Sequence, residues 1–102
     1  MKNVIKNAVL SFKQDVYDAQ DYIWANPETG YKEVKTSKYM ADVFEKLGYN
    51  ITRAENITGF YTDIDTGKIG PTVLIMGELD SIICPSHPEA DKETGAVHSC
   101  GH

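Results

Sequence analysis

The side chains with the strongest metal-binding chemistry gather at one end of this sequence. The run GAVHSCGH, residues 95 to 102, holds two of the three histidines and one of the two cysteines. Cys100 and His102 are two positions apart, so an extended backbone turns both side chains to one face. A thiolate and an imidazole are good ligands for a borderline ion such as Zn²⁺. Two ligands do not complete a site, so spacing alone leaves a disordered tail as the other interpretation.

The other two histidines carry weaker signals. His98 precedes Cys100 by two positions, and three alternate ligands in a row would crowd a single ion, so we expect it to orient a ligand or contact substrate instead. His87 stands between two prolines in CPSHPE and is expected to be a solvated loop residue.

Two acidic residues follow the most apolar run of the chain. Glu78 and Asp80 come directly after TVLIMG and share a side in extended geometry. Ligands of open α/β sheets collect at the carboxyl ends of strands, which makes Asp80 a candidate site residue. The alternative is a pair of solvated loop acids. We expect Asp80 to reach a metal at Cys100 and His102 only if the long loop between them folds back.

Periodic apolar positions predict the elements that must hold these side chains. Apolar residues at 5, 8, 12, 16, 19 and 23 form one helical stripe and predict a helix over 3–25. A second helix is predicted over 33–47, ended by Gly48 in a left-handed cap with Tyr49 folded back onto Phe44. Pro27 and Gly30 in NPETGYKE mark the turn between the two helices.

Strand signals follow the second helix. NITRA and GFYTDID are typical of short strands, and TVLIMG, residues 72–77, predicts a central strand covered on both faces. The last 25 residues, 78–102, show no apolar period and are expected to form a loop. The predicted architecture is α/β, with two helices packed on a partial mixed sheet in a single domain over 1–102.

Composition excludes some classes of function. With 15 acidic and 10 basic residues the net charge is −5, and no basic cluster offers a site for nucleic acid. No stretch approaches the roughly 20 apolar residues of a membrane span. The N-terminus lacks a signal-peptide pattern, so we expect a cytoplasmic protein whose two cysteines are reduced, although one disulfide is the other option.

Four landmarks in order resemble a known family of enzymes. NPETGYKE, TSKYMADVFEKLGY, GELDSI and GAVHSCGH are similar to the N-terminal portion of the aminoacylase-like metallopeptidases and amidohydrolases, which include hippurate hydrolase, auxin-conjugate amidohydrolases and aminobenzoyl-glutamate hydrolases. The resemblance implies a zinc-exopeptidase-like catalytic domain. It also implies that Cys100 and His102 are metal ligands and that Asp80 is a catalytic support. The ion would be Zn²⁺, with Mn²⁺, Co²⁺ or Ni²⁺ as alternatives.

The resemblance also implies a reaction. In such enzymes the metal pair lowers the pKa of a water molecule that attacks an amide carbonyl, and a glutamate takes its proton. That glutamate and the remaining ligands follow the Cys-Gly-His segment in the family. We therefore expect a truncated piece, inactive alone and unable to bind its metal fully, that belongs to an enzyme acting on small N-acyl amino acids or dipeptides.

Two other hypotheses stay open, a stand-alone metal- or partner-binding module and one half of a split enzyme. The chain has Ile82 and Ile83 where the family often has a Leu-Pro pair, which leaves the substrate pocket undetermined. If 72–77 is an uncovered strand, its edge invites self-association.

Overall fold

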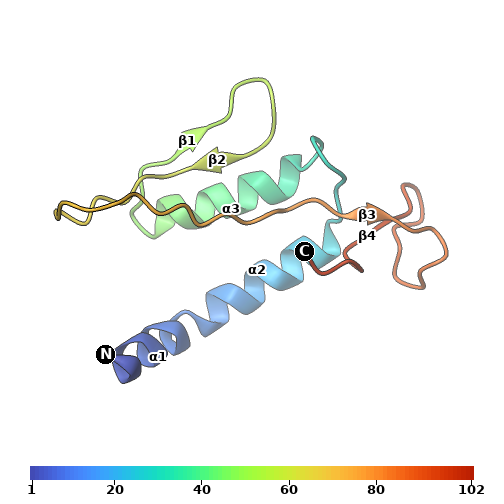
Figure 1. The fold of residues 1–102 in the computed structure, drawn as a ribbon. Helices are drawn as coiled ribbons and strands as arrows, with labels where there is room; N and C mark the ends of the chain where they lie inside the picture. The colour runs from blue at the N-terminus through green and yellow to red at the C-terminus, as the bar shows by residue number, and fades with distance from the viewer.

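The computed structural model describes residues 1–102 and is a mixed arrangement of helices and short antiparallel strands (Figure 1). The strands form two separate pairs, β1 with β2 and β3 with β4. The elements in order are α1 (Lys2–Ser11), α2 (Lys13–Ala25), α3 (Val34–Lys46), β1 (Thr52–Arg53), β2 (Phe60–Tyr61), β3 (Ile82–Ile83) and β4 (Ala96–Val97).

The predicted helix over 3–25 is divided into α1 and α2 at Phe12. The Phe12 backbone has φ −99° and ψ 7°, and its N–H donates to the Val9 carbonyl, three residues back, at 3.2 Å. The Ser11 hydroxyl also donates to the Ala8 carbonyl at 2.6 Å, competing with the helical bonds of that turn. Figure 1 shows the two helices following one another.

The apolar stripe of these helices is mostly exposed. Ile5 and Val16 each expose 58% of their surface, and only Ala19 and Ile23 of the stripe are half-buried. Only the end of α2 is covered, where Tyr22 stacks on Tyr39 of α3 at 4.2 Å between ring centroids. The periodicity therefore predicts the helical backbone correctly, while most of its apolar face finds no partner in these residues.

The second helix agrees with its prediction. α3 ends where expected, Gly48 has a left-handed φ of +96°, and the Tyr49 N–H donates to the Phe44 carbonyl at 3.0 Å. The Tyr49 ring lies 5.8 Å from that of Phe44, as an apolar clasp over the helix end requires. Phe60 of β2 packs edge-on against Phe44 at 5.2 Å, which holds the β1–β2 pair against the helix.

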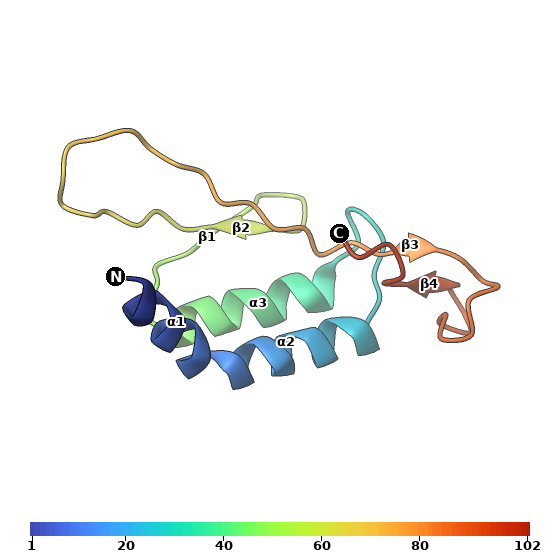
Figure 2. The same ribbon diagram turned by 60° about the horizontal axis from the view of Figure 1, so that its bottom comes forward.

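The predicted central strand over 72–77 is wrong for these 102 residues. The segment is in no sheet, and residues 63 to 80 make no backbone–backbone hydrogen bond. Val73, Leu74, Ile75 and Met76 expose between 76% and 94% of their surface. The segment returns from the long loop that Figure 2 shows extended away from the helices. A strand is stabilised by its neighbours, and no other strand of the chain is hydrogen-bonded to this segment.

The last 25 residues are more regular than expected. β3 and β4 form an antiparallel pair in which Ile82 faces Val97 and Ile83 faces Ala96. Ala96 and Val97 are only 1% and 2% exposed, and they make up most of a small apolar core with Ala41. Two-residue strands are too short to give a visible period, which is why the sequence pattern indicated a loop.

The connection between β3 and β4 is stabilised by a side-chain bridge. The Asp91 carboxylate accepts hydrogen bonds from the Glu93 and Thr94 amides and from the Thr94 hydroxyl at 2.8 to 3.0 Å. These bonds, of which the one from the Thr94 amide contributes most, hold the pKa of Asp91 below its usual value.

None of the three helices has both the length and the apolar composition that a membrane span requires.

Candidate metal centre

Ser81 is the first residue after the extended segment 63–80 whose backbone is hydrogen-bonded to another part of the chain. The Ser81 N–H donates to the Glu28 carbonyl at 2.7 Å, and Ser81 forms a parallel bridge with Thr29. Ser81 is only 5% exposed, whereas Asp80 is half-buried and Glu78 is exposed. The two carboxylates therefore stand just before the point where the chain is fixed to the turn between α2 and α3.

The β3–β4 pair turns the chain back toward these carboxylates. Because Ile82 faces Val97, the same register places Ser81 opposite His98, and the chain end then runs back along residues 78 to 81. His102 Nε2 lies 3.0 Å from Asp80 Oδ1 and 3.8 Å from Glu78 Oε2. One donor atom from each of the three side chains lies within 4.8 Å of the other two. The loop between Asp80 and His102 therefore folds back within the 102 residues, and this brings Asp80 into contact with His102.

The contact between His102 and Asp80 favours the charged form of both side chains. Hydrogen bonding by the Cys100 side chain, then by the Asp80 carboxylate, raises the pKa of His102 from 6.5 to about 9. The same bond from His102 is the main reason why the pKa of Asp80 lies below its ordinary value. Without a metal, His102 is thus a cation paired with Asp80 at neutral pH.

The predicted site residues are brought together to different degrees. The structure places His102 and Asp80 in direct contact, and it places the exposed Cys100 thiol beside His102. Glu78 joins the cluster although the sequence assigned it no role. The signal that identifies it is the two-residue spacing from Asp80, which puts both carboxylates on one side of the extended chain.

The remaining histidines differ in their surroundings. His98 is half-buried, and its Nε2 is shielded from solvent with no hydrogen-bond partner. Burial lowers the pKa of His98, and the positive charge of His102 lowers it further. His87 accepts a hydrogen bond from the Glu89 amide at 3.1 Å and belongs to the turn after β3. Its role as an ordinary loop residue is consistent with that contact.

The donor set suits a divalent ion of borderline character. Two carboxylates and an imidazole converge, with a thiol adjacent, and oxygen, nitrogen and sulfur donors of this kind bind Zn²⁺ and its first-row neighbours. Both Cys84 and Cys100 are free thiols. The residues present therefore fit a metal ion, and the hydrogen bond that the Asp80 carboxylate accepts from His102 is of the kind that orients a histidine ligand.

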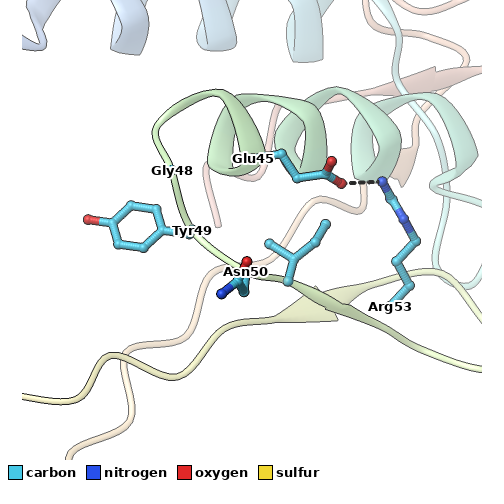
Figure 3. Close-up of a pocket in the computed structure, with 6 residues that line it drawn as sticks. Glu45, Gly48, Tyr49, Asn50 and Arg53 are labelled. Carbon is cyan, nitrogen blue, oxygen red and sulfur yellow. Dashed lines mark hydrogen bonds and ion pairs between the residues drawn. The ribbon is translucent and has the colours of Figure 1, made fainter.

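A shallow pocket lies elsewhere and carries none of these groups. Figure 3 shows it at the C-terminal end of α3, where Glu45 and Arg53 form an ion pair at 2.7 Å beside Gly48, Tyr49 and Asn50. The candidate metal centre instead lies near the N-terminal end of α3, next to β3 and β4.

Comparison with known proteins agrees with the motifs. No family model matches the sequence, and no solved structure matches it. Curated proteins do match. The chain is 29% identical to thermostable carboxypeptidase 2 of Saccharolobus solfataricus, with 96% of this chain and 26% of the relative aligned. It is also 29% identical to a p-aminobenzoyl-glutamate hydrolase chain of Escherichia coli, over 96% of this chain and 22% of the relative.

A plant relative shows the same pattern. IAA-amino acid hydrolase ILR1-like 4 of Arabidopsis thaliana is 34% identical over 78% of this chain and 19% of the relative. The chain resembles amidohydrolases and carboxypeptidases. The resemblance indicated by the four sequence landmarks is thereby confirmed, and the chain spans about a quarter or less of the length of the relatives it matches.

Proposed function

We propose that these 102 residues form part of a metal-dependent amidohydrolase or peptidase that cleaves the amide bond of small N-acyl amino acids or dipeptides. The observation that carries the proposal is the convergence of His102 with Asp80 and Glu78 next to Cys100. The printed names of the relatives support it, since they are hydrolases of p-aminobenzoyl-glutamate, IAA-amino acids and hippurate, together with carboxypeptidases.

Three residues at the site, Cys100, His102 and Asp80, have a role in this proposal. Cys100 and His102 hold a divalent ion, Zn²⁺ first and Mn²⁺, Co²⁺ or Ni²⁺ as alternatives. Asp80 orients the His102 imidazole through the bond at 3.0 Å and keeps negative charge at the site. The bound metal supplies Lewis acidity, which polarises an amide carbonyl and lowers the pKa of water.

The proposal includes a larger catalytic unit with a zinc-exopeptidase-like fold. The chain spans 19 to 26% of its relatives, and its apolar segment from Val73 to Met76 is uncovered. Further strands and helices of such a unit would bury that segment and supply the general base. We place the protein in the cytoplasm, where the free thiols of Cys84 and Cys100 stay reduced. The 102 residues alone are expected to be inactive.

One observation favours a second candidate function. The three donor groups converge without any contribution from outside this chain. A stand-alone metal-binding module, or one half of a split enzyme, would show the same convergence. The affinity for metal distinguishes these candidates, because a partial site binds weakly whereas a complete site binds tightly and with fixed stoichiometry.

Calorimetric titration with Zn²⁺ is the direct test. We expect weak binding that falls at least about tenfold in Cys100→Ala and in His102→Ala, because each removes a direct ligand. His87→Ala is the matched control, since it removes a histidine outside the cluster and should leave the affinity unchanged. Equal Zn²⁺ affinity in Cys100→Ala, His102→Ala and His87→Ala would refute the assignment of Cys100 and His102 as ligands. Tight one-to-one binding by a monomer would make the stand-alone module the better interpretation.

Activity assays complete the test. We expect no hydrolysis of N-acyl amino acids or dipeptides by the 102 residues with added Zn²⁺, Mn²⁺ or Co²⁺, since the catalytic glutamate of the proposed larger unit follows the Cys-Gly-His segment. Metal-dependent turnover that disappears in Cys100→Ala would contradict the proposal of a partial site.

A further inference from the structure

Glu28 links the turn before α3 to the candidate metal centre through two different groups. Its carboxylate accepts hydrogen bonds from the Lys35 and Thr36 amides, at 3.0 and 2.8 Å. Its backbone carbonyl accepts the Ser81 amide at 2.7 Å. Glu28 belongs to NPETGYKE, a motif that the sequence explains only as a turn.

The carboxylate acts as the cap of α3. The residue at the formal N-cap position, Glu33, makes no side-chain bond to the helix end. The first amides of a helix have no partner within it, and negative charge is favoured at that end by the helix dipole. Glu28 reaches these amides from five residues before the N-cap, so the bonds fix the turn as well as the helix.

The fixed turn also holds the chain that arrives at β3. The backbone of residues 63 to 80 makes no hydrogen bond with other backbone, so Ser81 is the first anchored residue after a long unattached segment. The anchor consists of the bond from Ser81 to the Glu28 carbonyl and the parallel bridge with Thr29. Asp80 is covalently next to Ser81, and its carboxylate contacts His102.

We propose that Glu28 is a positioning residue for the metal centre, acting through Ser81 on Asp80 without touching the metal or its ligands. Neutralising its carboxylate loosens the turn, releases the Ser81 amide, and lets Asp80 drift from His102. The inference rests on the proposed metal-binding function, but the anchoring itself can be measured without a metal.

Glu28→Gln and Glu33→Gln make a matched pair of variants. Both remove a carboxylate at the start of α3. The Glu33 carboxylate, however, accepts the Thr58 hydroxyl, and Glu33 makes no hydrogen bond with Ser81. A glutamine at position 28 keeps one acceptor but presents an amide to the second helix N–H, which leaves that donor unpaired. Circular dichroism checks that both variants retain their helices. If Glu28→Gln loses them, Glu28→Asp, which keeps the charge, replaces it.

Hydrogen exchange of the Ser81 amide in the metal-free protein is the first measurement. We expect protection to fall at least about tenfold in the Glu28 variant and to stay unchanged in Glu33→Gln, since only the former loosens the acceptor. Unchanged protection in both variants would overturn the proposal.

Binding of Co²⁺, whose absorption spectrum reports its ligand geometry, is the second measurement. We expect the Glu28 variant to bind about tenfold more weakly and with an altered spectrum, in the range typical of residues that support metal ligands. The same affinity and spectrum as the unmodified protein would overturn the positioning role. If the unmodified protein binds no Co²⁺, the proposed function fails, and the Ser81 exchange result decides the anchoring role alone.

Discussion

His102 Nε2 lies 3.0 Å from Asp80 Oδ1, although 22 positions of sequence separate the two residues. The contact depends on the β3–β4 pair, which reverses the chain between them, and on the anchor of Ser81 at Glu28. It joins the two ends of a segment whose composition alone indicates a loop. The end of the molecule that carries the candidate metal centre is therefore organised by short-range pairing around a few residues, without a large core beneath it.

The titration of His102 is the first prediction. Its pKa is raised to about 9 by Cys100 and Asp80, so the ion pair with Asp80 is complete below the ordinary value of 6.5 and is lost as pH rises through about 9. We expect the imidazole proton resonance of His102 to titrate near that upper value in metal-free protein. In Asp80→Asn the midpoint should move down toward 6.5. A midpoint near 6.5 in the unmodified protein would rule out the contact.

Metal binding should show the opposite dependence on pH. A ligand must lose its proton to bind, and His102 carries one until about pH 9. Zn²⁺ affinity should therefore rise across neutral pH by about tenfold per pH unit for each proton displaced. Calorimetry in buffers of different ionisation enthalpy counts the released protons. Affinity that does not change with pH across the neutral range would mean that His102 is not a ligand.

The sequence predicts the local structure of this protein better than its packing. α3, its Gly48 cap and the clasp of Tyr49 on Phe44 depend on neighbours within a few positions, and all three are present. The strand over 72–77 depends on partners that these residues do not contain, and it fails. β3 and β4 were missed because two residues each carry no period. The turn signal at Gly95, which has a φ of +73°, was the available clue.

The site was predicted to a similar extent. Residue type, spacing and resemblance select Cys100, His102 and Asp80 as candidates, and their roles in metal binding stay predictions. The approach of Asp80 to His102 depends on the β3–β4 register, which the sequence does not display. Glu28 could not be identified as a positioning residue, because its carboxylate bonds to amides seven and eight positions later.

Gly95→Ala should disrupt the hairpin that carries the site. Gly95 has a left-handed φ of +73°, and an added Cβ would lie 2.9 Å from Pro85 Cγ, closer than real contacts allow. Gly67→Ala is the control, because Gly67 has a similar φ of +71° with nothing within 4 Å. The left-handed backbone costs both variants about 1 to 2 kcal/mol.

Only Gly95→Ala should also release His102 from Asp80. We expect the His102 midpoint to fall toward 6.5 in that variant and to stay near 9 in Gly67→Ala. Equal midpoints in the two variants would show that the packing of Gly95 against Pro85 does not support the site.

The last prediction is that the 102 residues self-associate through the uncovered apolar segment from Val73 to Met76. Ile75 is 94% exposed within a run of four apolar residues that makes no backbone hydrogen bonds, and such an edge accepts a strand from another chain. We expect the mean mass in sedimentation experiments to rise with concentration. Ile75→Lys should return the chain to a monomer, because pairing would bury the lysine charge at the strand edge. Ile69→Lys is the control, since Ile69 is also fully exposed but lies outside the run. A monomer at all concentrations, or the same loss of association in both variants, would contradict pairing through this segment.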